Sequence, residues 1–147
     1  MSLRCPVCHE AASLELRGGA EATVGTVAVT LERRPVVACV QGHEATPPEV
    51  VDAAMAAATS SLPRARKRLL RQDVCSACGA ALTMPVRRTV RPVTVEGAGG
   101  VPVLTLRFEM PSTRCPECGV DQVPSRSQED LVVSVPAVFA ARSPDSP

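Results

Sequence analysis

The spacing of seven cysteines is the feature that most constrains this chain of 147 residues. Six of them form three C-x-x-C pairs, and the seventh, Cys39, precedes His43 by four positions. Because a C-x-x-C turn places two thiolates on one side of a tetrahedral ion, two such clusters complete its shell. The pattern therefore predicts two metal sites. Their expected ligands are Cys5, Cys8, Cys39 and His43 in the first site, and Cys75, Cys78, Cys115 and Cys118 in the second.

The fourth ligand of the first site is the irregular one. A second C-x-x-C would need a cysteine at Gly42, and His43 is one residue further on. An imidazole is longer than a thiol and can reach back, so we expect His43 to bind. His9, which directly follows Cys8, is the competing candidate. In a C-x-x-C turn, here called a knuckle, glycine usually follows the second cysteine, which is the position of His9. We therefore expect the side chain of His9 to be exposed beside the metal.

Zinc is the expected metal, with two structural ions per chain. Iron is the alternative, because C-x-x-C-G knuckles also resemble those of rubredoxins. Rubredoxins pack aromatic side chains around the iron, whereas this chain has only Phe108 and Phe139. Redox or disulfide pairs are a further alternative, but seven cysteines paired as disulfides would leave one over. A small core built of Val, Leu and Ala supplies little hydrophobic stabilisation. Structural zinc would compensate, because a zinc site contributes on the order of 10 kcal/mol to the free energy of folding.

Between the cysteine clusters the pattern predicts strands. Apolar residues alternate with period two in Thr26–Glu32 and Pro102–Phe108. Val90–Val95 is the expected partner of the second strand, joined to it by the glycine-rich turn 96–100. Val36–Cys39 continues the sheet of the first half.

Helix is expected after His43 and strand near the end of the chain. The sequence 46–49 is a capping box, and Val50–Thr59 after it is apolar on nearly all sides. A second short helix is expected over 64–72. Residues 130–138 predict a strand that breaks at Pro136.

These elements indicate a small metal-stabilised α+β protein with an internal repeat of about 70 residues, a length typical of tandem small domains. The expected fold is two tandem zinc ribbons, built of β-hairpins or three-stranded sheets and joined by a helical segment. The expected organisation is zinc ribbon 1 over 1–46, a helical connector over 47–72, zinc ribbon 2 over 73–125, a C-terminal strand over 126–139 and a disordered tail over 140–147.

The first repeat resembles the MqsA/YgiT-type zinc-finger family. The matching residues are C-P-V-C-H-E at 5–10, P-V-V-A-C at 35–39, Glu44, and P-P-E-V-V-D at 47–52. The resemblance covers about residues 3–58 and implies structural zinc at Cys5, Cys8 and Cys39. In that family the ribbon often belongs to an antitoxin that grips a toxin protein, which implies a protein partner. Family antitoxins carry a DNA-binding helix-turn-helix after the ribbon, where this chain has a second ribbon.

The leading functional hypothesis is a non-enzymatic interaction or regulatory module that contacts a partner protein. A homo-oligomer could form through the apolar helix Val50–Ala58. We expect no enzyme, because both metal shells are filled and a zinc deaminase would need H-x-E with P-C-x-x-C. Here Glu10 directly follows His9, and Arg114 precedes Cys115.

Nucleic-acid binding is the alternative hypothesis. On a helix, Arg64, Lys67, Arg68 and Arg71 would lie within about 100° and could contact phosphates of DNA or structured RNA. The net charge of +1 excludes a uniformly basic coat. The near absence of aromatic residues argues against base stacking on single strands.

The sequence also favours a reducing compartment. No apolar run approaches the roughly 20 residues of a membrane span, and Met1–Pro6 lacks the regions of a signal peptide. We therefore expect a cytoplasmic protein without membrane contact, in which cysteine pairs bind metal. Fifteen arginines against one lysine indicate a GC-rich bacterial genome.

Overall fold

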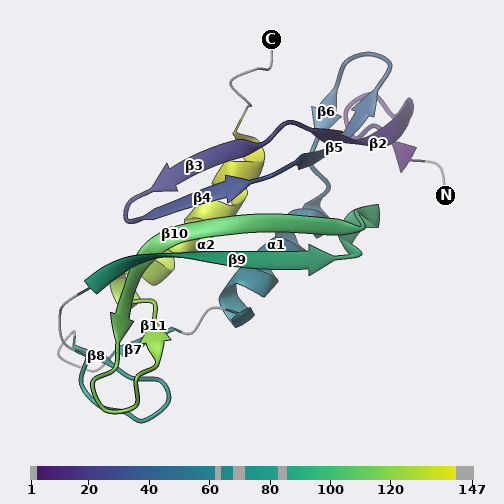
Figure 1. Cartoon of the computed structure of the whole chain (residues 1–147). Helices are drawn as coiled ribbons and strands as arrows, with labels where there is room; N and C mark the ends of the chain where they lie inside the picture. The colour runs from purple at the N-terminus through teal and green to yellow at the C-terminus, as the bar shows by residue number, and fades with distance from the viewer. Residues whose placement is uncertain (1–2, 62–63, 68–71, 83–85, 142–147) are drawn as a thin grey trace.

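The computed structural model describes residues 3–61, 64–67, 72–82 and 86–141 and shows a small α+β chain with antiparallel sheets and two helices (Figure 1). Its first half contains β1 (Leu3–Arg4), β2 (Ala11–Arg17), β3 (Ala20–Val24), β4 (Val27–Leu31), β5 (Arg34–Cys39), β6 (Glu44–Ala45) and α1 (Pro48–Ser61). Its second half contains β7 (Arg66–Lys67), β8 (Asp73–Val74), β9 (Val86–Glu96), the short 3-10 helix η1 (Ala98–Gly100), β10 (Val103–Arg114), β11 (Asp121–Gln122) and α2 (Ser125–Ala140).

Each half consists of a hairpin with cysteine clusters at its base, followed by one helix. In the first half β2 pairs with β5 and β3 pairs with β4, so the two arms of one hairpin run through two sheets. The arms cross closely at Gly19, where a β-carbon would lie 2.8 Å from the carbonyl oxygen of Leu31. In the second half β9 and β10 form one long hairpin. Its turn contains Gly97, Gly99 and Gly100 at positive φ, which confirms the predicted glycine-rich turn.

The two halves share one sheet, in which β10 is the central strand. It pairs with β9 along one side, and with β4 and then β11 along the other, all antiparallel. Phe108 lies opposite Val29 of β4 and Arg91 of β9. The five-stranded sheet therefore contains strands from both of the segments that were expected to be separate ribbons, 1–46 and 73–125. Strands β1, β2, β5 and β6 form a separate four-stranded sheet at the end of the molecule that carries the N-terminus (Figure 1).

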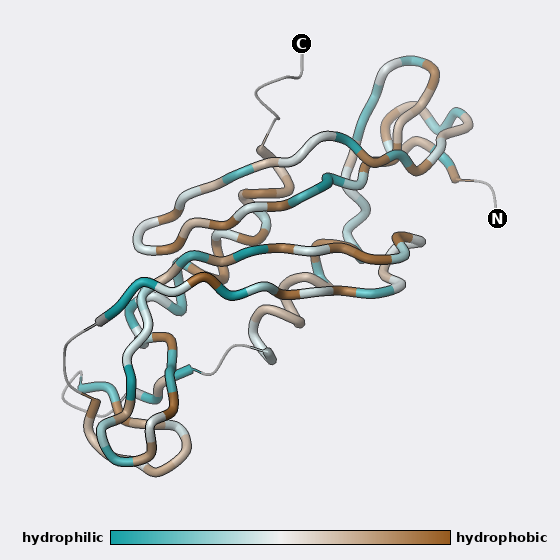
Figure 2. The backbone as a smooth tube through the Cα atoms, in the orientation of Figure 1, coloured by the Kyte–Doolittle hydropathy of each residue, from teal (hydrophilic) through white to brown (hydrophobic). Residues whose placement is uncertain are grey.

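Both helices cover the same face of the five-stranded sheet, and each packs on the hairpin of the other half (Figure 1). Helix α1 contacts β9, whereas α2 contacts β3 and β4, and the two helices contact each other. Figure 2 shows hydrophobic and hydrophilic residues alternating along β9 and β10, as a sheet with one buried face requires. The fully buried side chains include Val27, Leu31, Leu106, Phe108 and Met110 from the sheet, and Val50, Leu131 and Val135 from the helices.

The predicted C-terminal strand over 126–139 is wrong, because Ser125–Ala140 is helix α2. Its buried residues recur at helical spacing, at Leu131, Val135 and Val138. The β-branched residues of this segment favour a strand on local propensity alone. In the structure, β3 and β4 contact one side of the segment, and these tertiary contacts stabilise a helix instead. The helix continues through Pro136.

The second short helix predicted over 64–72 is wrong where the structure describes the chain. Arg66–Lys67 is strand β7, which pairs with β8, and Arg64 forms a bridge with Val123. The backbone N–H of Ala65 donates to the carbonyl oxygen of Val123, so pairing with distant residues replaces local helical bonds. Residues 68–71 lie outside the described chain, as do positions 142–147 of the expected tail.

Helix α1 confirms the prediction for Val50–Thr59, but its apolar side is covered. Val50, Ala54 and Ala58 are fully buried within the chain. Asp52 and Ala56 on the same helix are exposed, and a homo-oligomer through Val50–Ala58 stays a prediction.

Candidate metal centres

The first cysteine cluster lies at the outer end of the four-stranded sheet. Cys5 and Cys8 belong to the turn between β1 and β2, Cys39 ends β5, and His43 directly precedes β6. The ligand atoms of these four residues all lie within 4.8 Å of one another. The Sγ atoms of Cys8 and Cys39 are 3.7 Å apart, and Cys39 Sγ is 3.4 Å from Nδ1 of His43.

The second cluster lies at the opposite end of the molecule (Figure 1). Cys75 and Cys78 form the turn after β8, and Cys115 and Cys118 form the turn between β10 and β11. Their four sulfur atoms also lie within 4.8 Å of one another. The Sγ atoms of Cys75 and Cys118 are 3.5 Å apart, as are those of Cys78 and Cys115.

These distances fit a tetrahedral ion better than they fit disulfides. With Zn–S bonds of about 2.3 Å, tetrahedral geometry places two sulfurs about 3.8 Å apart, and a sulfur and a nitrogen about 3.6 Å apart. A disulfide would need about 2.05 Å between sulfurs. All seven cysteines are free thiols. Each group can therefore hold one metal ion with four protein donors.

The three C-x-x-C turns share one backbone pattern. In each, the N–H of the residue after the second cysteine donates to the carbonyl oxygen of the first cysteine, at 2.9 Å in all three. That residue adopts positive φ: 62° at His9, 77° at Gly79 and 78° at Gly119. His9 thus takes the knuckle position that glycine occupies elsewhere, and it is exposed. The structure places His43, and not His9, with the cysteines of the first group.

Backbone amides lower the pKa of the first thiol in all three C-x-x-C turns, that is, of Cys5, Cys75 and Cys115. The N–H of Cys8 lowers the pKa of the Cys5 thiol to about 6, helped by the N–H of Val7, whose nitrogen lies 3.4 Å from the sulfur. Burial raises the pKa of the Cys75 thiol, but the N–H groups of Cys78 and Ala77 outweigh burial and bring this pKa to about 6. At least one thiolate is thus available in each group near neutral pH.

The second thiol of the Cys75 knuckle behaves in the opposite way. The N–H of Ala80 lowers the pKa of Cys78, but the Cys115 thiol and burial outweigh it and raise this pKa to about 12. Cys78 therefore keeps its proton at neutral pH until a metal ion displaces it. Binding at the second group must release this proton, so metal affinity falls as the pH is lowered.

Two residues that the sequence analysis missed support the second group. Gln122 is 1% exposed, and its Nε2 donates to the sulfur of Cys75 at 3.1 Å. Its Oε1 accepts from the backbone N–H of Ser76 at 2.7 Å. Asp73, just before the same turn, accepts from the backbone N–H of Ser125 at 2.9 Å and so satisfies one of the free N–H groups at the start of α2. No local spacing marks either residue, because both contacts join segments distant in sequence.

The four predicted nucleic-acid contacts do not form a helical face in the described chain. Arg64 lies in a bridge and is exposed, and Lys67 is in strand β7. Arg68 and Arg71 lie outside the described residues. Nucleic-acid binding stays a prediction.

Searches against family models, curated proteins and solved structures found no match to this chain. Within the described residues, neither helix is long and apolar enough to span a membrane.

Proposed function

We propose that this chain is a non-enzymatic zinc-binding protein whose two structural ions hold both ends of one shared core, and that the first metal end contacts a partner protein. The observation that carries the proposal is the pair of complete four-donor groups. A catalytic zinc keeps a position open for water, and these groups supply four protein donors each. Zinc is preferred to iron because the thiolate and imidazole donors suit it and aromatic residues are almost absent.

A pair of exposed apolar side chains supports the partner at the first metal end. Val7 and Val40 are 64% and 86% exposed, and they stand in the two turns that supply Cys8 and Cys39. The positions equivalent to Val7 and Val40 in the second group carry the smaller Ala77 and Pro116 instead. Exposed apolar side chains held by a rigid turn are typical of protein contacts. The resemblance to the MqsA/YgiT-type ribbon favours the same end.

Metal analysis of the purified chain tests the zinc part of this proposal. We expect two zinc ions per chain, and one in each of the variants Cys8→Ser and Cys78→Ser. Iron in place of zinc would contradict the metal identity, and a metal-free folded chain would contradict the structural role.

Affinity capture from the native host tests the partner part. The variant V7S/V40S should lose a stoichiometric partner protein that the wild-type chain retains. The matched control is V90S/V103S, because Val90 and Val103 are also exposed, at 62% and 56%, but lie on β9 and β10. A partner lost equally from both variants, or no stoichiometric partner for the wild-type chain, would contradict this part.

A further inference from the structure

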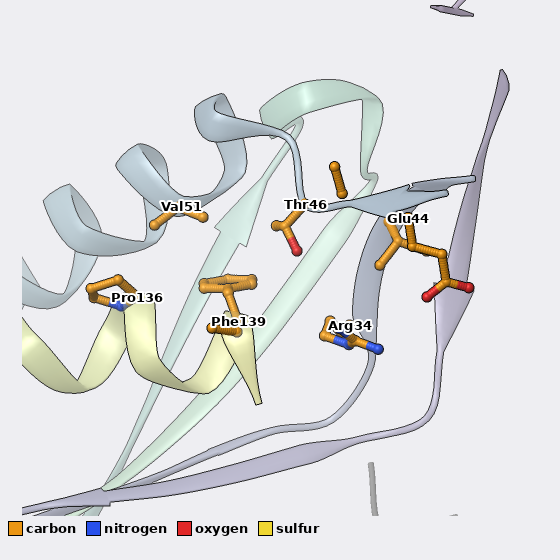
Figure 3. Close-up of a pocket in the computed structure, with 9 residues that line it drawn as sticks. Arg34, Glu44, Thr46, Val51, Pro136 and Phe139 are labelled. Atoms are coloured by element: carbon orange, nitrogen blue, oxygen red, sulfur yellow. The ribbon is translucent and has the colours of Figure 1, made fainter. Parts of the chain in front are cut away.

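A cavity of about 360 Å³ lies between the four-stranded sheet and the two helices; none of the eight candidate metal ligands lines it, although Glu44, which does, directly follows His43. Its polar wall consists of Arg34, Glu44 and Thr46, and its apolar wall of Val51, Pro136 and Phe139. Figure 3 shows Arg34 and Phe139 on facing sides of this space. The volume falls at the small end of the range for small-molecule sites. The size and the two unlike walls suit a small amphipathic molecule.

Arg34 is the unsatisfied group in this cavity. Its Nε is buried without a hydrogen-bond partner. Among the described residues, no carboxylate oxygen lies within 4.0 Å of its guanidinium. A buried donor in a native structure is nearly always paired, so an unpaired one requires an explanation. An anionic acceptor entering the cavity would supply the missing bonds.

The neighbouring carboxylates cannot take this role, because Arg17 already holds them. Arg17 Nη2 lies 2.6 Å from Glu15 and 2.7 Å from Glu44, and Arg17 Nε donates to Glu44 at 2.9 Å. The pairing of β2 with β5 places Arg17 directly opposite Arg34. Arg17 and Arg34 therefore lie side by side, and the carboxylates of Glu15 and Glu44 both form ion pairs with Arg17.

The surroundings select a single negative charge. The carboxylate of Glu44, although paired with Arg17, repels any anion, and it repels a dianion such as phosphate more strongly than a monocarboxylate. The last turn of α2 borders the cavity through Phe139 and Ala140, and the C-terminal end of a helix carries partial negative charge. A planar carboxylate also matches the donor fork of a guanidinium.

We propose that this cavity binds a small monocarboxylate with an apolar body, whose carboxylate pairs with Arg34 and whose body packs on Val51, Pro136 and Phe139. The contact would join strand β5, which ends at the metal ligand Cys39, to helix α2 of the second half. This proposal does not depend on the identity of the metal or of the partner.

An NMR titration of the metal-loaded full chain tests the proposal, with benzoate and hexanoate as probes. We expect saturable shifts at the backbone amides of Arg34, Thr46 and Phe139, and affinity at least tenfold weaker for benzamide and for phosphate. R34Q should weaken benzoate binding at least tenfold, and R34K should restore part of it. The matched control is R33Q, which removes the same charge from the exposed neighbour of Arg34 and should bind as the wild-type chain does.

A second variant keeps the test decisive if R34Q does not fold. Pro136 is exposed on α2 and lines the cavity, so P136E adds a negative charge there, whereas P136Q does not. We expect P136E to weaken benzoate binding much more than P136Q does, because both variants remove the proline ring from the apolar wall but only P136E adds a negative charge. The absence of saturable binding of either acid would overturn the proposal. So would equal affinity for benzoate and benzamide, or equal loss in R33Q and R34Q.

Discussion

The two halves of this chain have the same plan, but they support their metal groups differently. In the first half, the ligands lie in the turn between β1 and β2, at the end of β5 and just before β6, and these strands form a sheet of their own. In the second half, Cys115 directly follows β10, the central strand of the shared sheet. Gln122 and Asp73 further join that group to β11 and α2. A metal ion in the second group would thus be attached to the main core, and one in the first group would hold a peripheral sheet.

The largest expected effect is a difference between two single-ligand variants. Cys115→Ser and Cys39→Ser should each reduce the metal content from two ions to one. We expect C115S to cost about 5 kcal/mol and lower Tm by about 10–20 °C, because its metal joins β10 to β8 and β11. C39S should cost about 2–3 kcal/mol. Thermal unfolding followed by circular dichroism measures both, and equal or reversed losses would refute the comparison.

A second test addresses the unequal donors of the two groups. His43→Ala should release the first metal and leave one ion per chain, because three thiolates alone do not close the shell. H43C should keep both ions, since it converts the first group to four thiolates like the second. The control H9A should also keep both. Loss of a metal in H9A, with two ions kept in H43A, would assign the ligand role to His9.

Gln122 should affect the second metal and leave the first unchanged. Q122L removes the bond to the Cys75 sulfur and leaves the Ser76 N–H without its acceptor. We expect both metals to bind, with affinity at the second site about 10–100 times weaker, the usual effect of losing a partner of a metal ligand. Competition with a chromogenic chelator measures this, using the variant C8S to report the second site alone. Unchanged affinity in C8S/Q122L would show that Gln122 only fills space.

The smallest expected effect is a gain in stability. His9 adopts φ 62°, where Gly79 and Gly119 stand in the other knuckles. His9→Gly should raise the free energy of unfolding by about 0.5 kcal/mol, because relief of left-handed strain exceeds the added entropy of the unfolded chain. Chemical denaturation of the metal-loaded chain measures it. The control G79A should destabilise, and a loss of stability in H9G would show a contact for the imidazole.

The two groups of candidate metal ligands and the β9–β10 hairpin could be predicted from the sequence because their signals are local. C-x-x-C spacing and a glycine-rich turn between alternating segments depend on neighbours within a few residues. Helix α2 could not be predicted in this way, since its side chains are buried by β3 and β4, about a hundred residues earlier in the chain. The same reason hid strand β7, Gln122 and the unpaired Arg34, whose partners or surroundings come from distant segments.

Native mass spectrometry of the freshly purified chain tests the central claim most directly, because it counts metal ions and disulfides in one spectrum. The account predicts, under native conditions, the mass of the disulfide-free chain plus two zinc ions less the protons that they displace. After acid unfolding in the absence of oxidant, it predicts the mass of the bare chain with seven free thiols. A native mass that lacks metal and falls short by two hydrogens for each cysteine pair would show disulfides in place of the metal groups and contradict it.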